Sequence, residues 1–250
     1  MGKPSRRRVR TQGPVGRYLG ATRSPLVGFA VTLPLLLLYN VGLLMPGGGV
    51  GNGADLLSGL VSRQWGLWGM LGLNAVLVLV SVAALVWLAR KGRFVAGHWA
   101  ALVGEGLVYG VALGLVAPWV VGQAFPMTAV PPVRLSFMEV LSTSAGAGYW
   151  EELVFRLGFV GGAVAVARKA SSHQGLKGSA WTVGVGIVAV VLSSLVFSLV
   201  HHMGAVETPE AYVFWYRVMA GAVFGAIFLL RGFAVAAYSH FLYDVMVMLL

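Results

Sequence analysis

Residues 67–88 have the sequence LWGMLGLNAVLVLVSVAALVWL and include no charged side chain. This stretch is longer than the ~18 apolar residues that mark a candidate transmembrane helix. A backbone in lipid has to satisfy its own hydrogen bonds, so we expect the stretch to be helical. It ends at Arg90-Lys91-Gly92-Arg93, a basic cluster of the kind that flanks a span on the cytoplasmic side. The stretch therefore predicts a membrane-spanning α-helix.

Six further stretches share this apolar character: Leu26–Met45, His98–Val121, Leu135–Val166, Trp181–Val200, Tyr212–Leu230 and Phe233–Leu250. The alternation typical of β-barrel strands is absent. The sequence thus predicts an all-α, polytopic transmembrane helix bundle of about seven spans. We expect a single domain over residues 26–250, preceded by a basic cytoplasmic tail over 1–25 without regular structure.

Two of these stretches are expected to be irregular. Pro34 is a candidate kink in the first span. The stretch Leu135–Val166 exceeds the ~20 residues that one span needs, so its first part is a candidate interfacial helix.

The charge is low and unevenly distributed. Charged residues make up 10% of the chain, where a soluble domain has about a quarter. The net charge is +10, and seven of the eighteen Lys and Arg residues lie in the first 23 positions. This placement favours contact with anionic lipid headgroups over nucleic-acid binding, and it predicts a cytoplasmic N-terminus. We expect a multi-pass protein of the bacterial inner membrane.

The chain has no cysteine, which excludes disulfides, thiol catalysis and Cys-ligated metal. Candidate functional residues are therefore the ionisable groups inside apolar segments, where burial without a partner is costly. The densest group is Tyr149–Arg156, YWEELVFR. Glu152 and Arg156 are four residues apart and can form an ion pair on one helix face. Glu151 points elsewhere and suits a general base or acid.

Two later segments add histidines. Phe197 and His201 share one face at the end of the fifth apolar stretch, and the adjacent His202 has to point in a different direction. His240 and Asp244 share a face inside the last one. These groups could support peptide hydrolysis, ligate zinc through two histidines and a carboxylate, or relay protons in a transporter. The residue types leave all three open.

The three motifs Glu151-Glu152-x-x-x-Arg156, Phe197-x-x-x-His201 and His240-x-x-x-Asp244 resemble, in order and spacing, those of the CPBP family. This family comprises Rce-type CAAX prenyl endopeptidases and bacterial Abi or bacteriocin-processing relatives. The resemblance covers a core of about residues 135–250. It implies an intramembrane glutamate protease that acts without a metal, zinc being the alternative.

The resemblance also implies a role for each residue. Glu151 would activate the attacking water with help from His201, while His240 and Asp244 would stabilise the oxyanion. Glu152, Arg156 and Phe197 would support them. The prenyl endopeptidases have Asn where this chain has Asp244, and an ionised Asp cannot donate a hydrogen bond.

Counting ~1.5 Å per residue from the cytoplasmic ends puts Glu151 and His201 in the outer half of the bilayer and His240 lower. An outer site predicts processing or sorting of exported or membrane-anchored proteins at a C-terminal segment. The alternatives are a prenyl-CAAX-type endopeptidase and a non-proteolytic scaffold or immunity factor of the same fold. The substrate would be a protein or peptide with a membrane-associated segment. The sequence does not indicate an oligomeric state.

Overall fold

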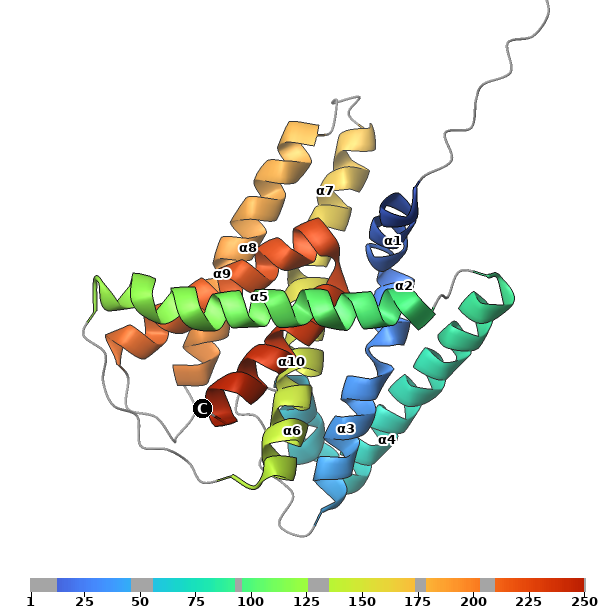
Figure 1. Ribbon diagram of the computed structural model, residues 1–250, viewed down its shortest axis with the longest axis horizontal. Coiled ribbons are helices and arrows are strands. Elements are labelled where there is room, and N and C mark those ends of the chain that lie inside the picture. Colours follow the sequence, from blue (N-terminus) through green and yellow to red (C-terminus); the bar gives the residue numbers. More distant parts are fainter. Residues whose placement is uncertain are drawn as a thin grey trace, which may run out of the picture.

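Figure 1 shows the computed structural model, which describes residues 13–45, 56–92, 96–125, 135–173, 179–202 and 210–249. The described residues form helices and short turns, with no strand among them. The helices are α1 (Pro14–Thr22), α2 (Pro25–Val31), α3 (Leu33–Leu44), α4 (Leu56–Arg90), α5 (Ala96–Gly122), α6 (Phe137–Gly146), η1 (Ala147–Gly161), α7 (Gly162–His173), α8 (Ser179–His202), α9 (Ala211–Arg231) and α10 (Phe233–Leu249). The predicted all-α class is confirmed.

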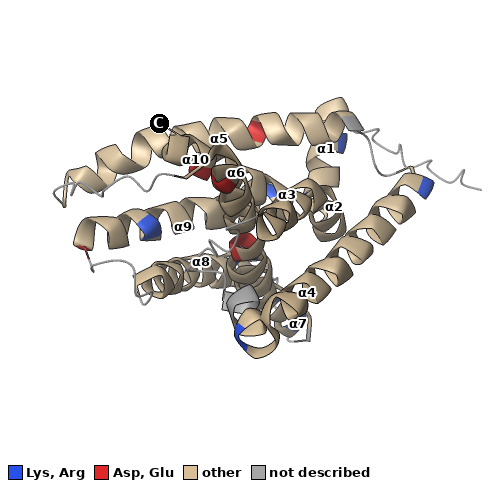
Figure 2. Cartoon of the chain, turned by 90° about the horizontal axis from the view of Figure 1, so that it is seen from below, with Lys and Arg blue, Asp and Glu red and all other residues tan. Residues whose placement is uncertain are grey.

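Five segments within the described residues are long and apolar enough to cross a membrane: Pro25–Leu44, Leu60–Arg90, Gly97–Gly122, Ala180–His202 and Ala211–Arg231. The shorter α10 is also apolar. Charged residues are few along the ribbon, as Figure 2 shows. The predicted count of seven spans stays a prediction, as does the cytoplasmic N-terminus.

Two helices change direction where the sequence requires it. The first span is divided at Thr32, directly before Leu33 and Pro34, which begin α3. This break agrees with the predicted kink. The second span was expected to begin at Leu67, but α4 begins at Leu56 and bends at Gly66, whose φ of 61° is favourable only for glycine.

The predicted irregular tail is wrong for part of its length, because residues 14–22 form α1. Residues 1–12 lie outside the described part of the chain. The hydroxyl of Tyr18 on α1 donates to Glu105 Oε2 at 2.5 Å. Burial and this carboxylate raise the pKa of Tyr18 to about 12, so the hydroxyl keeps its proton at neutral pH. The interaction fastens α1 to α5.

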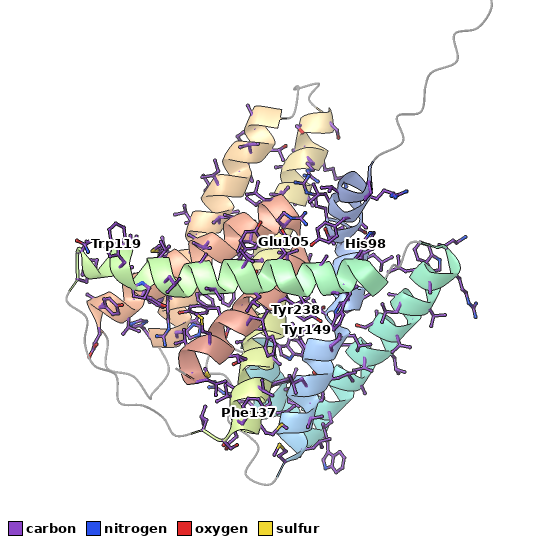
Figure 3. The ribbon with its side chains drawn as sticks, viewed as in Figure 1. His98, Glu105, Trp119, Phe137, Tyr149 and Tyr238 are labelled. Carbon is purple, nitrogen blue, oxygen red and sulfur yellow. The ribbon has the colours of Figure 1, made fainter. Side chains whose placement is uncertain are left out.

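Glu105 also binds the end of α9. Its two oxygens accept hydrogen bonds from Arg231 Nε at 2.5 Å and Nη2 at 2.8 Å. Such a bidentate ion pair is a strong, directional contact. In Figure 3, Glu105 lies on α5 between the labelled His98 and Trp119. Three elements far apart in sequence therefore meet at this carboxylate.

The long apolar stretch after residue 134 forms three consecutive helical pieces. Ser136 begins α6 with a capping box, in which its side chain accepts from Glu139 N–H and Glu139 accepts from Ser136 N–H. The helix continues into η1, a π-helix, and then into α7. π-Helical turns are rare and occur frequently at functional sites. The interfacial position of the first part of this stretch stays a prediction.

The last helix, α10, is the centre of the bundle. It packs against α5, η1, α9, α6 and α2, and α5 crosses in front of it in Figure 1. All eight residues from Phe233 to His240 are buried. Gly232, with φ 95°, permits the abrupt turn from α9. The sequence places small residues here, so neighbouring helices approach closely.

Gly148 sets the distance between η1 and α10. A Cβ atom at this position would lie 2.6 Å from the Ala237 carbonyl oxygen and 2.9 Å from Phe241 Cβ. A backbone atom cannot move aside as a flexible side chain can. Glycine at this position therefore serves close helix packing. The crossing places Glu151, three residues after Gly148, beside His240, three residues after Ala237.

We predict that Gly148→Ala lowers the free energy of unfolding by about 1–3 kcal/mol, because an overpacked contact forces the two backbones apart. Thermal unfolding of the purified protein in detergent measures this. Gly162→Ala is the matched control, since a Cβ at 162 meets nothing within 4 Å. It should leave stability unchanged or raise it by up to about 1 kcal/mol. Equal melting temperatures for the two variants would contradict the prediction.

Candidate active site

Glu151 lies between two histidines from different helices. Its Oε1 is 3.7 Å from His201 Nε2, and its Oε2 is 3.7 Å from His240 Nε2. η1, α8 and α10 therefore each contribute one of these groups. Only 2% of Glu151 is exposed. The carboxylate is thus enclosed, with an imidazole nitrogen near each of its oxygens.

Glu152 forms the base of the site. Its Oε1 is 3.0 Å from Arg156 Nη1 and 2.9 Å from His240 Nδ1. Glu152 and Arg156 are both fully or almost fully buried. The predicted ion pair between them is present. Glu152 also contacts His240, the histidine of the third motif, and this second contact was not predicted.

Arg156 links this pair to α9. Its Nη2 donates to the Gly221 carbonyl at 3.2 Å. Its guanidinium also lies over two rings, 4.7 Å from the centroid of Phe197 and 5.6 Å from that of Phe224. A buried guanidinium over aromatic faces gains cation–π attraction. One side chain of η1 therefore contacts both α8 and α9.

Two aromatic rings hold the histidines. Phe197 packs on His201 with ring centroids 4.6 Å apart, and Phe224 stacks on His240 at 4.4 Å with an interplanar angle of 19°. Phe197 also meets His240 edge-on at 6.2 Å. These contacts leave each imidazole little freedom to rotate.

Hydrogen bonds fix the protonated nitrogen of His201. Its Nδ1 is 2.8 Å from the Phe197 carbonyl oxygen, which can only accept. Nδ1 therefore carries a proton, and Nε2 faces Glu151, where it is an acceptor whenever the ring holds a single proton. The same argument assigns a proton to Nδ1 of His240, beside the carboxylate of Glu152.

His202 points away from the site, as the sequence predicted. Its Nδ1 contacts the Ser198 carbonyl at 2.9 Å, and its ring meets Phe214. Asp244 lies near the site, with Oδ2 3.5 Å from His240 Nε2. His240 therefore contacts carboxylates from three residues: Glu151, Glu152 and Asp244.

The lower depth expected for His240 was wrong. That expectation treated the spans as parallel rods with one rise per residue. In the structure α10 crosses η1 at Gly148, so His240 reaches Glu151 although it lies only two turns into its helix. The π-helix also has more residues per turn than an α-helix, so the rise counted along η1 was too large.

Sequence reasoning missed Phe224 and Gly221, which contact His240 and Arg156. Neither belongs to a recognised motif. The available signal was small-residue spacing on the sixth apolar stretch. A Cβ at Gly221 would lie 3.1 Å from Ser194 Cβ, so α8 and α9 meet closely there. That spacing predicts a helix contact, but not its partner.

No group of three or more His, Asp or Glu side chains within the described residues is arranged to hold a metal ion. At Glu151 the carboxylate oxygens face the Nε2 atoms of His201 and His240 at 3.7 Å. Zinc ligands would instead converge on one point at about 2 Å each.

Residues 133–246 match the family model described as Rce1-like, Type II CAAX prenyl endopeptidase Rce1-like. No curated protein and no solved structure matches the chain. The family match covers all three motifs and confirms the recognition made from them: the matched part of the chain is Rce1-like. With five apolar helices of membrane-spanning length among the described residues, the protein is an integral, multi-pass membrane protein, and its residues 133–246 match a family of proteases.

Proposed function

We propose that this Rce1-like protein is an intramembrane glutamate endopeptidase, in which Glu151 activates the attacking water with the help of His201. The observation that carries the proposal is the Glu151 carboxylate, enclosed between the Nε2 atoms of two histidines at 3.7 Å. A base held in this way is within reach of a bound water and of a peptide carbonyl beside it.

The protonation pattern supports a water at this point. When His201 is neutral, its Nε2 and Glu151 Oε1 are both acceptors, and a water can bridge them. A water about 2.8 Å from each would donate one hydrogen to the carboxylate and the other to the imidazole. Its lone pair would then face a substrate carbonyl carbon.

The proposed reaction is hydrolysis of a peptide bond by this water. Glu151 takes one proton, and the hydroxide oxygen bonds to the carbonyl carbon. The resulting oxyanion accepts a hydrogen bond from His240 Nε2, for which the ring has to carry protons on both nitrogens. Glu151 then gives its proton to the amide nitrogen as the C–N bond breaks. The products are a carboxylic acid and an amine.

Asp244 orients His240 in this scheme. Its carboxylate lies 3.5 Å from Nε2, close enough to accept from the protonated ring. Glu152 does the same at Nδ1. Two carboxylates thereby fix both nitrogens of the imidazole, while Arg156 neutralises Glu152. An Asn at position 244 would also offer an acceptor oxygen, and its amide could donate to the oxyanion.

We further propose that the substrates are exported or membrane-anchored proteins of a bacterial inner membrane, cut at a C-terminal segment. α8 and α9 are antiparallel: Ser198 contacts the carbonyl of Phe214 near the start of α9, and Gly186 faces Leu229 near its end. His201 is therefore at the end of the bundle away from Arg231. If the basic end is cytoplasmic, the site opens outside.

A prenyl-CAAX-type activity is the second candidate, favoured by the description of the matching family. It would require a cytoplasm-facing site. Purified protein incubated with a farnesylated CAAX peptide and with an unmodified C-terminal peptide of an exported protein separates the two. Cleavage of the farnesylated peptide alone would support the prenyl activity, and cleavage of the unmodified one would support our proposal.

Glu151→Gln should lower the cleavage rate by about a hundredfold to ten-thousandfold, because an amide cannot accept the water proton. The measurement is precursor cleavage in cells, with protein abundance determined by immunoblot. Glu139→Gln is the matched control, since Gln preserves the capping box at Ser136. A scaffold or immunity factor would keep its phenotype in Glu151→Gln, which would contradict the protease assignment.

For Asp244, we expect the Asn variant to retain activity within about tenfold of the parent. The Ala variant should lose about 10- to 100-fold, the usual result of losing a hydrogen bond to a charged group. The loss should fall on kcat with little change in KM, because His240 would act only in the transition state. Loss of all activity in Asp244→Asn together with normal activity in Asp244→Ala would contradict this role.

We propose that the chemistry needs no metal. A chelator such as 1,10-phenanthroline should leave cleavage by the purified protein unchanged. Inhibition that is reversed by added zinc, and not by added magnesium, would instead favour the zinc alternative, with the two histidines and Glu151 as ligands.

A further inference from the structure

A groove lies between α5 and α9, on the side of α9 away from the candidate active site. Its volume is about 350 Å³. Buried Leu113 and Ile227 belong to its lining, and exposed Ala112 and Ala226 form part of its sides. Phe224, which stacks on His240, is not part of the lining. The groove is therefore separate from the chemistry proposed above.

The groove is polar at one end only. Tyr109 and Arg231 lie at this end, where both interact with Glu105. The opposite end is lined by the apolar side chains of Val116 and Met219. From Met219 to Leu230 the groove follows α9 for about 16 Å. This length is close to one half of a ~30 Å hydrocarbon layer.

Arg231 has hydrogen-bonding capacity that the protein does not use. Its Nε and Nη2 bind Glu105, and Nη2 also donates to Thr22, but its buried Nη1 has no hydrogen-bond partner among the described residues. Only 7% of Arg231 is exposed. Buried donors are almost always satisfied, so an unsatisfied one lining a groove points to a ligand acceptor.

A second cation lies beside this end. Arg23 donates through Nε to the Leu230 carbonyl at 2.7 Å, and it is exposed. Its charge is not paired with a carboxylate in any salt bridge among the described residues. Glu105 compensates Arg231, so Arg23 leaves this end net positive. A negatively charged group is therefore the complementary ligand.

We propose that the groove binds one acyl chain of an anionic phospholipid, whose headgroup phosphate accepts hydrogen bonds from Arg231 and Arg23. The apolar length suits the chain and the basic end suits the phosphate. Basic pockets between transmembrane helices commonly bind anionic headgroups in this way. Exposed apolar residues of the lining, such as Val116 and Leu230, provide a surface through which a membrane lipid can enter.

Native mass spectrometry of the full chain in mild detergent, titrated with phosphatidylglycerol or with phosphatidylcholine of the same chains, tests this proposal. We expect tighter binding of phosphatidylglycerol. Ala226→Phe and Ala112→Phe should each weaken it by about tenfold, because about two fewer methylene groups could be buried. Val108→Phe, on α5 but outside the lining, is the matched control and should bind normally.

The headgroup contact has its own variants. Arg23→Gln should lower the preference for phosphatidylglycerol over phosphatidylcholine by several fold, whereas Arg63→Gln, at an exposed arginine on α4, should not. Equal binding by the Phe variants and the control would overturn the groove as the site. Equal affinity for the two lipids would overturn the anionic ligand. Displacement of the lipid by a farnesylated peptide would show that the groove binds the prenyl chain of a substrate, and it would overturn the lipid proposal.

Discussion

The candidate site depends on the burial of Glu152. Its side chain has no exposed surface, and a buried carboxylate needs partners that are held in fixed positions. Arg156 and His240 both contact the same oxygen, so one interaction holds η1 to the central helix α10. Arg156 extends the link to α9 through the Gly221 carbonyl and to α8 through the Phe197 ring. Glu152 therefore positions His240, and this placement sets the geometry around Glu151. We assign Glu152 itself no chemical step.

The sequence was sufficient for the features that depend on local spacing. The i,i+4 relation predicted the Glu152–Arg156 pair and distinguished His201 from His202, and apolar length predicted where most helices lie. The sequence did not predict the features that depend on contacts between distant segments. The stack of Phe224 on His240 and the bend at Gly66 have no sequence motif. The depth of His240 was misjudged because crossing angles and the π-helical turn of η1 depend on packing. The helix over residues 14–22 contacts Glu105, which is far away in the sequence and which no local pattern links to it.

Ionic contacts occur at two levels of this apolar bundle, and α9 takes part in both. One face of α9 presents the Gly221 carbonyl and Phe224 to the candidate site, while its last residue, Arg231, forms the bidentate pair with Glu105. Each cluster joins helices that are distant in sequence. A proton-relay transporter would need polar groups that connect such clusters across the membrane. Between them α9 presents mainly apolar side chains, which agrees better with two separate functions, one chemical and one in lipid contact.

The contact at Gly148 limits how this protein can change over evolutionary time. Most close contacts between helices can be repaired when a partner side chain becomes smaller, so paired substitutions at such positions accumulate in families. Here the opposing atom nearest to a Cβ is the Ala237 carbonyl oxygen, which every amino acid carries. Smaller side chains on α10 would leave that oxygen in place. Position 148 therefore has no compensating partner, and lineages in which His240 has to reach Glu151 would keep glycine there while the surrounding residues vary.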